Sequence, residues 1–184
     1  HNYTKFYFIF KKEFINSLKY PPSSAFFKVL QKHIASYFPQ NKALRILDIG
    51  CSDGVLGYCC KSTLKCQEIE GIELVERLSS IAESRKYKDF QVYNKVNTGD
   101  FYEIIKNFDA KYDLILAENF ASYKADFEGT ISAALKLLSK GGMLAFSFRE
   151  TKKYDKLEFV IDDEDFSFNL KHVEKIVNKL ALKV

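Results

Sequence analysis

Residues 43–54, ALRILDIGCSDG, are the stretch that most restricts how this chain can fold. A short apolar run ends around Asp48, and a helical pattern of apolar residues begins directly after the stretch. Small or glycine residues form the turn between them: Gly50, Cys51, Ser52 and Gly54. Strand, glycine turn and helix in this order are typical of α/β proteins that bind a nucleotide-like ligand. The glycines let the backbone approach the ligand, and the start of the helix offers unpaired N–H groups.

Strands and helices alternate along the rest of the chain. Apolar runs predict further strands at residues 69–74, 90–98, 112–117 and 143–148. Helical patterns separate these runs, and Gly141 with Gly142 is expected to end the last of them, over residues 127–140. We therefore expect an α/β fold with a Rossmann-like, doubly wound, mainly parallel sheet.

The length of 184 residues and a hydrophobic fraction of 47% predict a single domain with a sizeable core. Residues 1–40 are expected to form an N-terminal helical cap, with one helix over residues 3–19 and a second after the proline pair. Residues 43–148 form the predicted core. Residues 149–184 are expected to supply further strands and a final helix.

Glu73 ends the predicted second strand, 19 positions after Gly54. An acid at the end of this strand can accept hydrogen bonds from ribose hydroxyls. The alternative is an acid that faces the positive end of the following helix. The spacing and the strand context favour the ribose role.

Asp100 follows the predicted third strand in the sequence GDF. Its carboxylate could accept a hydrogen bond from an adenine amino group, with Phe101 beside the ring. Asn94 is the alternative if the register of this strand is shifted.

Taken in order, ILDIGCSDG, GIEL, TGDF, KYDLILAENF and LLSKGGMLAFSF resemble the motif set of class I S-adenosylmethionine-dependent methyltransferases. The resemblance covers residues 44–148, and the ordered set is more specific than any one motif. In detail it looks closest to the methyltransferase domains of predicted TPR-repeat methyltransferases. Those domains carry Tyr-x-x-Pro before the first strand, similar to Tyr20 and Pro22 here, where the proline is displaced by one position. They also carry Phe-Ser after the double glycine, as at Phe146 and Ser147. No TPR repeat is evident in this sequence.

The resemblance implies S-adenosylmethionine as cofactor and S-adenosylhomocysteine as product. The glycine turn would pack against the methionine part and the ribose, with Ser52 standing where a second glycine is commoner. Tyr20 would close over the cofactor from the N-terminal helices. The implied cofactor-binding residues are Asp48, Gly50, Cys51, Ser52, Gly54, Glu73, Leu74, Asp100, Phe101, Glu118, Asn119 and Tyr20.

No catalytic residue is assigned, because methyl transfer depends mainly on positioning. Glu118, Asn119 and Tyr123 are the candidates near the reacting centre, whereas His172 on the final helix is interpreted as a surface residue. The Asn/Asp-Pro-Pro-Tyr motif of base N-methyltransferases is missing after the fourth strand. The net charge is only +4, with no block of like charges. The expected acceptor is a small molecule or a protein side chain rather than a nucleic-acid base.

Only 36 residues follow Phe148. Family members usually add two further strands there as a hairpin, so we expect either a compressed tail or a chain without that last β-hairpin. The short tail leaves open an alternative function, a cofactor-binding module that regulates or assists a partner without catalysing transfer.

Two other classes of enzyme share parts of the pattern. Residues 50–54 fit the G-x-S-x-G elbow of α/β-hydrolases, but only helical patterns precede them, whereas that elbow normally follows several strands. A nicotinamide dehydrogenase would carry a third glycine at position 55, which is Val55. The four cysteines lack metal-ligand spacing, so no metal is expected. Reduced thiols and the missing membrane span favour a cytoplasmic protein without membrane partners.

Overall fold

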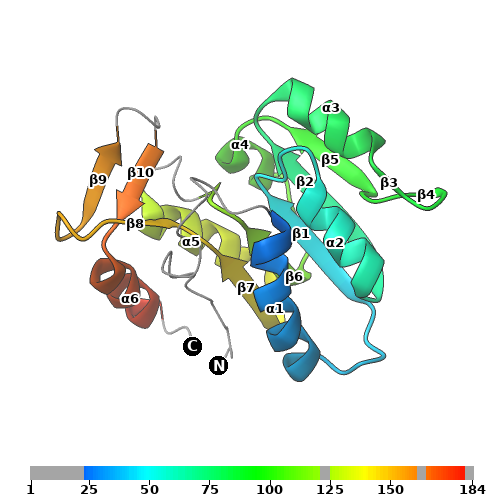
Figure 1. The fold of residues 1–184 in the computed structure, drawn as a ribbon, viewed down its shortest axis with the longest axis horizontal. Helices are drawn as coiled ribbons and strands as arrows, with labels where there is room; N and C mark the ends of the chain where they lie inside the picture. The colour runs from blue at the N-terminus through cyan, green and yellow to red at the C-terminus, as the bar shows by residue number, and fades with distance from the viewer. Residues whose placement is uncertain (1–22, 121–124, 161–164, 181–184) are drawn as a thin grey trace.

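A sheet of five parallel strands, in the order β5-β2-β1-β6-β7, forms the centre of the protein (Figure 1). The computed structural model describes residues 23–120, 125–160 and 165–180. The predicted helix over residues 3–19 lies outside these ranges, as does Tyr20. The five strands are β1 Leu44–Ile49, β2 Cys66–Glu73, β5 Lys95–Thr98, β6 Tyr112–Ala117 and β7 Leu138–Phe146.

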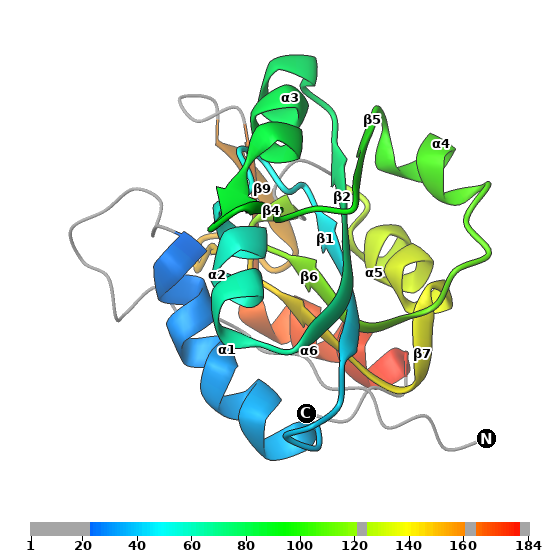
Figure 2. The ribbon, with the colours of Figure 1, turned by 90° about the vertical axis from the view of Figure 1, so that its right-hand side faces the viewer.

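Helices cover both faces of this sheet (Figure 2). On one face lie α1 Ser23–Tyr37, α2 Val55–Thr63 and α3 Glu76–Ser84, and on the other lie α4 Phe101–Ile105, α5 Phe127–Lys136 and α6 Leu170–Lys179. Successive residues of a strand point to opposite faces, so Ile46 packs in the cluster under α1 and α2 while Leu47 packs in the cluster under α5. Burial on both faces explains why these strands are almost continuously apolar in sequence. The predicted doubly wound parallel sheet is confirmed.

The predicted third strand is wrong in its first half. Only β5 joins the central sheet, where Lys95 pairs with Glu70 and Thr98 pairs with Glu73. The preceding residues form a separate hairpin of β3 Lys86–Tyr87 and β4 Phe90–Gln91. The polar residues that interrupt residues 90–98 mark the point where the chain leaves this hairpin and enters the sheet.

The glycine pair does not end the helix before it, as the sequence suggested. Helix α5 already ends at Lys136, and β7 begins at Leu138, so Gly141 and Gly142 lie within the strand. The register of β7 against β6 shifts there, and Gly141 adopts a φ of 71°. A Cβ on Gly142 would stand 2.9 Å from Leu138 and 3.0 Å from the carbonyl oxygen of Asp113. The glycines therefore serve an irregularity in the strand where it passes close to its neighbour.

The C-terminal residues form a second, smaller sheet. Its strands are β8 Arg149–Glu150, β9 Leu157–Val160 and β10 Asp165–Phe168, in the order β8-β10-β9. Strand β10 runs parallel to β8 and antiparallel to β9. Within the described residues this tail does not extend the central sheet, which ends at β7 on one side. Helix α6 follows and buries Val173, Ile176 and Val177 in the same cluster as α5.

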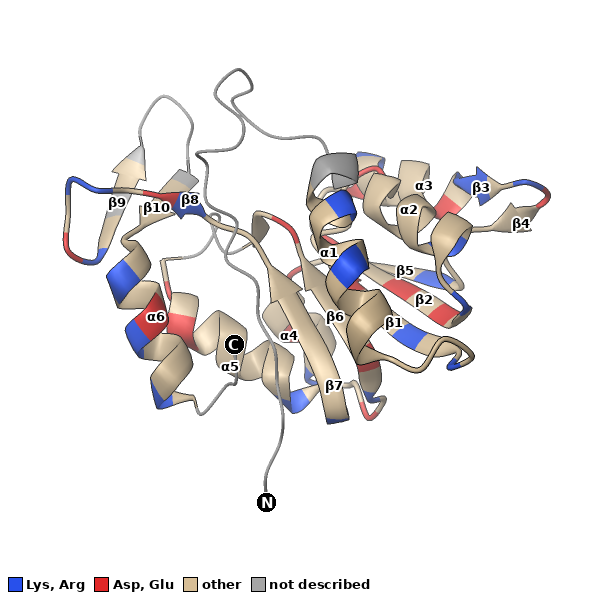
Figure 3. Ribbon diagram, turned by 60° about the horizontal axis from the view of Figure 1, so that its bottom comes forward, with Lys and Arg blue, Asp and Glu red and all other residues tan. Residues whose placement is uncertain are grey.

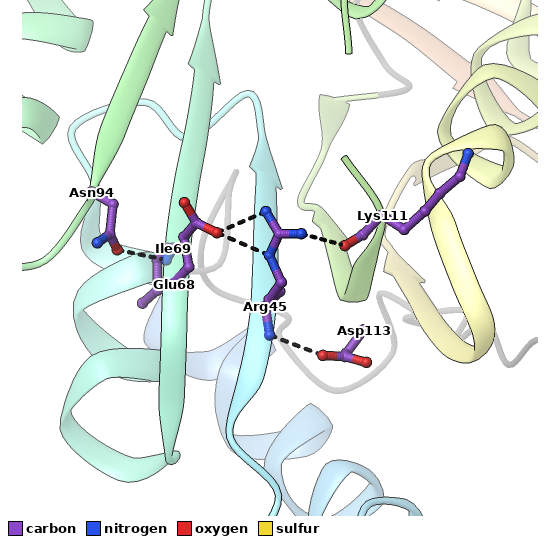
Figure 4. Close-up of polar contacts among 6 residues, drawn as sticks. All are labelled: Arg45, Glu68, Ile69, Asn94, Lys111 and Asp113. Atoms are coloured by element: carbon purple, nitrogen blue, oxygen red, sulfur yellow. Dashed lines mark hydrogen bonds and ion pairs between the residues drawn. The ribbon is translucent and has the colours of Figure 1, made fainter. Parts of the chain in front are cut away.

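Polar side chains join the strands at their amino-terminal ends (Figure 4). Arg45 Nε on β1 donates to Glu68 Oε2 on β2 at 2.9 Å, and Arg45 Nη1 donates to the carbonyl of Lys111 at 3.4 Å. The backbone N–H of Arg45 donates to Asp113 Oδ2 on β6 at 3.0 Å. These contacts fix the end of the sheet that lies opposite the glycine turn. None of the helices in the described ranges is long and apolar enough to cross a membrane.

Candidate functional site

The predicted site residues that the structure describes lie at or just after the carboxyl-terminal ends of four neighbouring strands. The loop after β1 lies between β2 on one side and β6 on the other, because Asp48 pairs with both Gly71 and Leu116. From β1 the chain continues to β2 and β5 in one direction, whereas β6 and β7 lie in the other direction. Ligands of open α/β sheets bind at such a switch point.

The loop between β1 and α2, residues 50–54, is here called the glycine loop. Gly50, Ser52 and Gly54 all lie in the left-handed region, with φ values of 71°, 50° and 85°. A Cβ at Gly50 would stand 3.1 Å from the Phe120 ring, and one at Gly54 would stand 2.9 Å from the Tyr93 ring. Both glycines are therefore required by space as well as by conformation. Ser52 adopts a conformation that glycine accepts without strain, which agrees with a glycine being commoner at this position.

Glu73 connects β2 to the glycine loop. Its Oε2 accepts the N–H of Ser52 at 2.8 Å, and its Oε1 accepts the N–H of Val75 at 2.8 Å. Val75 is the residue before α3, so Glu73 also stands at a helix start, as the alternative interpretation expects. Each carboxylate oxygen has a second lone pair with which it can accept a hydrogen bond from a ligand.

The residues after Glu73 present an apolar surface. Leu74 is 64% exposed and Val75 is 49% exposed, although both follow a buried strand. They adjoin the carboxylate that the glycine loop holds. A flat, partly apolar ring could pack on this surface while its polar substituent reached Glu73.

Asp48 is a buried carboxyl group below the glycine loop, with 1% of its surface exposed. It accepts a hydrogen bond of 2.6 Å from the Tyr93 hydroxyl. The pKa of Asp48 is raised to about 7, chiefly because the group is buried; the Tyr93 hydrogen bond opposes this shift, while the negative charges of Glu118 and Glu73 add to it. Three carboxyl groups thus influence one another at this end of the sheet.

Cys51 lies in the glycine loop and is buried. Burial raises the pKa of its thiol, so the group is uncharged at neutral pH. A Cβ at Gly71 would stand 2.8 Å from the Cys51 sulfur. Cys51 therefore fills space between β1 and β2.

Tyr93 is a site residue that the sequence did not reveal. Its ring lies against three glycines, because a Cβ at Gly54, Gly57 or Gly71 would stand 2.9, 2.3 or 3.2 Å from its atoms. The contact to Asp48 spans 45 residues of sequence, and no local pattern reports it. A glycine within a helical pattern, at position 57, was the one available signal of a close neighbour.

Asp100 and Phe101 lie at the start of α4. Asp100 caps the helix and accepts the N–H of Tyr102 at 2.9 Å. The N–H of the preceding Gly99 donates to the Glu73 carbonyl at 2.9 Å, which brings this loop beside β2. The Phe101 side chain is only 2% exposed and packs against Phe120, with ring centroids 5.2 Å apart. It supports the site from the core.

Asn94, the alternative to Asp100, lies before β5 and accepts the N–H of Ile69 at 2.9 Å (Figure 4). It is therefore not at the carboxyl-terminal ends of the strands.

Glu118 and Asn119 follow β6. Asn119 has a φ of 53°, and its N–H donates to the Ser147 hydroxyl at 2.8 Å, which joins the ends of β6 and β7. The candidates Tyr20 and Tyr123 lie outside the described residues. His172 is on α6 and half-buried. Within the described ranges no group of three His, Cys, Asp or Glu side chains could hold a metal ion.

The five-stranded parallel sheet with helices on both faces is the Rossmann-like fold of class I methyltransferases, and the structural neighbours have this fold. Residues 24–164 match the family described as methyltransferase domain, and the chain belongs to this family. No curated protein matches the sequence.

Three solved structures illustrate the likeness. A Leishmania major S-adenosylmethionine-dependent methyltransferase aligns at a TM-score of 0.66 and 19% identity, over 88% of this chain and 63% of its own. Magnesium protoporphyrin IX methyltransferase from Synechocystis, with bound S-adenosylmethionine, aligns at 0.60 and 14% identity, over 85% and 67%. Phosphoethanolamine N-methyltransferase 2 from Haemonchus contortus, in complex with S-adenosylmethionine, aligns at 0.67 and 17% identity, over 89% and 38%. This chain thus spans between 38% and 67% of these proteins.

Proposed function

We propose that this protein binds S-adenosylmethionine at the carboxyl-terminal ends of β1, β2, β5 and β6 and transfers its methyl group to an acceptor. The observation that carries the proposal is Glu73, whose two oxygens are held by the N–H groups of Ser52 and Val75 beside the glycine loop. Membership of the methyltransferase domain family supports it. So do the Synechocystis and Haemonchus structures, which contain this cofactor.

The residues present fit such a cofactor. Glu73 would accept hydrogen bonds from the ribose hydroxyls, because the backbone contacts orient both oxygens and leave lone pairs on each. The exposed Leu74 would pack against the purine ring. Asp100 would accept a hydrogen bond from the adenine amino group.

The glycine loop would lie against the methionine part and the ribose. In this loop the left-handed conformations of Gly50, Ser52 and Gly54 turn the backbone sharply between β1 and α2. The cofactor supplies an activated methyl group on a sulfonium sulfur, so the protein needs to position and shield the reactants more than to activate them. Glu118 and Asn119, at the end of β6, lie where an acceptor would meet the cofactor.

The proposed acceptor is a small molecule or a protein side chain. The sequence after β6, Glu118-Asn119-Phe120-Ala121, lacks the motif of base N-methyltransferases. In the described residues, basic and acidic side chains are spread over several elements rather than gathered by sign (Figure 3). Two of the neighbours are named for magnesium protoporphyrin IX and phosphoethanolamine, which are small molecules.

The test is a calorimetric titration with S-adenosylmethionine and S-adenosylhomocysteine. Glu73→Gln should weaken the binding of S-adenosylhomocysteine by about tenfold or more. The amide has no negative charge to strengthen the hydrogen bonds of this side chain, and its NH₂ group would face the backbone N–H of Ser52 or Val75. Glu76→Gln is the matched control, since Glu76 is exposed in the first turn of α3 and should bind as the wild type does. No binding by the wild type, or equal binding by the Glu73 variant, contradicts the proposal.

A second candidate is a module that binds the cofactor without transferring its methyl group. Incubation with methyl-labelled cofactor and pools of small molecules or proteins distinguishes the two. Transfer of the labelled methyl group by the wild type, abolished in Glu73→Gln, supports an enzymatic function. Tight binding of the cofactor without any transfer supports a non-catalytic binding module.

Three finer statements are also proposals. The motif Phe146-Ser147 supports a closer relation to the methyltransferase domains of TPR-repeat methyltransferases. Residues 1–184 are proposed to form one domain, with the core at 43–148. The free cysteines of the described residues support a cytoplasmic location.

A further inference from the structure

We propose that Tyr93 and Arg85 are positioning residues that hold the glycine loop from its two ends in the shape that binds the cofactor. The inference rests on the proposed function and assigns a role to the hairpin of β3 and β4, whose base carries both residues. Neither residue belongs to the motifs identified in the sequence.

Tyr93 contacts residues on both sides of the loop. Its buried ring lies against Gly54 at the end of the loop, Gly57 in α2 and Gly71 in β2, so it touches the loop and the elements on either side. Its hydroxyl donates to Asp48, two residues before the loop, at 2.6 Å. Movement of Tyr93 would therefore be transmitted to both β1 and the glycine loop.

Arg85 holds the carboxyl-terminal end of the loop. Its Nε donates to the carbonyl of Asp53 at 2.6 Å, and its Nη2 donates to the Asp53 carboxylate at 3.0 Å. The two bonds use the planar guanidinium to fix the backbone and the side chain of one residue together. Asp53 lies directly before Gly54.

The base of the hairpin joins these two contacts. The N–H of Val92 donates to the Arg85 carbonyl at 3.0 Å, which brings the two ends of the hairpin together. The Tyr87 ring contacts Tyr58 of α2, with ring centroids 5.6 Å apart. Arg85 and Tyr93 therefore both extend from the base of the hairpin, which packs against α2. They contact the glycine loop at two points.

The charges around Asp48 provide a specific readout for the Tyr93 contact. Asp48 faces Glu73 on β2, Glu118 after β6, and the thiols of Cys51 and Cys60, and the N–H of Gly57 also stabilises its charged form. Its pKa is about 7, and the Tyr93 hydrogen bond lowers this value. Removing the hydroxyl should therefore raise the pKa of Asp48 further. The ionised carboxylate accepts hydrogen bonds from both the Tyr93 hydroxyl and the N–H of Gly57. Cofactor binding should therefore strengthen as Asp48 loses its proton.

The experiment measures S-adenosylhomocysteine affinity from pH 6 to pH 9 for the wild type and for Tyr93→Phe. The wild type should bind more tightly as the pH rises through about 7. Tyr93→Phe should bind about tenfold more weakly near pH 7, as expected for the loss of a hydrogen bond to a charged group, and its midpoint should move to higher pH. Tyr154→Phe is the matched control, because Tyr154 is an exposed tyrosine outside the hairpin and the glycine loop and should keep the wild-type curve.

Arg85→Gln separates the two contacts. It should weaken binding several-fold at every pH without moving the midpoint, because Arg85 bonds to Asp53 and not to Asp48. If Tyr93→Phe does not fold, Asp48→Asn replaces it, and its binding should lose the pH dependence.

Three results overturn the inference. They are a Tyr93→Phe curve that superimposes on the wild type, an equal loss at all pH values without a shifted midpoint, and an Asp48→Asn variant that keeps the wild-type midpoint. No binding by the wild type overturns the proposed function and this inference with it. Wild-type binding with an unchanged Tyr93→Phe curve overturns the inference alone.

Discussion

Tyr93 fills a space that three glycines leave open, and this arrangement reverses the usual effect of glycine in a helix. Gly57 lies within α2, where alanine would ordinarily be preferred by about 1 kcal/mol. A Cβ at this position would stand 2.3 Å from the Tyr93 hydroxyl oxygen. Helix propensity therefore predicts that Gly57→Ala stabilises the protein, whereas the contact with Tyr93 predicts that the same substitution destabilises it.

Gly57→Ala should lower the free energy of unfolding by about 1–3 kcal/mol, because overpacking outweighs the gain in helix propensity. Urea denaturation measures the change. Ser80→Ala, at an exposed position of α3, is the control and should remain within about 0.5 kcal/mol of the wild type. A Gly57→Ala variant more stable than the wild type would show that propensity dominates and that the ring is not fixed there.

The site residues that could be predicted are those that follow strands in a fixed order. Glu73 ends β2 and Asp100 lies two residues after β5, and the parallel sheet places both near the glycine loop. Tyr93 and Arg85 could not be predicted, because their partners Asp48 and Asp53 are 45 and 32 residues away. Such contacts depend on how the hairpin before β5 lies against α2, which no local pattern specifies.

The helices and strands differ in how well their ends could be predicted. Strand β6 has the predicted bounds, Tyr112–Ala117, because a buried parallel strand is an unbroken apolar run. The end of α5 was predicted four residues too late, since Leu138 continues the helical apolar pattern although it already pairs with Tyr112. A glycine pair after a helix signals its end in most sequences, but here it serves the register shift in β7.

Helix α5 begins with a capping residue whose contribution can be measured. Asp126 accepts the N–H of Gly129 at 2.8 Å and satisfies a donor that the first turn would otherwise leave unpaired. Asp126→Ala should therefore lower the free energy of unfolding by about 0.5–2 kcal/mol. Asp109→Ala, at an exposed position outside the helices, should have little effect, and equal losses from both would contradict the capping role.

The stability of the whole fold depends on the ionisation of one buried carboxyl group, that of Asp48. The pKa of Asp48 is about 7 in the folded protein, whereas an unfolded aspartate ionises near about 3.9. A raised pKa means that the protonated carboxyl favours the folded state. This stabilising contribution is complete below the unfolded pKa and is lost as the pH rises towards about 7.

Asp48→Asn removes that contribution along with the charge. Relative to the wild type, its free energy of unfolding should therefore increase between pH 5 and pH 8, by at least about 1.4 kcal/mol, the equivalent of one pKa unit. Denaturation curves at the two pH values provide the measurement, with Asp109→Asn as an exposed control. A difference that stays constant with pH would show that Asp48 ionises normally. The carboxylate persists at a cost in stability because, on our inference, the ionised form orders the glycine loop.

The contacts of the Tyr93 ring also constrain how this sequence can diverge. They are made with Gly54, Gly57 and Gly71. Each glycine leaves room for the Tyr93 ring. A larger residue at any one of the three positions therefore requires that the ring moves or that a smaller side chain replaces it. Conversely, a relative with a small residue at position 93 would leave space for a side chain at position 57, whereas a Cβ at Gly54 would still meet Ala82 and one at Gly71 would still meet Cys51. Positions 57 and 93 should therefore change together among relatives, and an aromatic residue at 93 should predict glycine at 57.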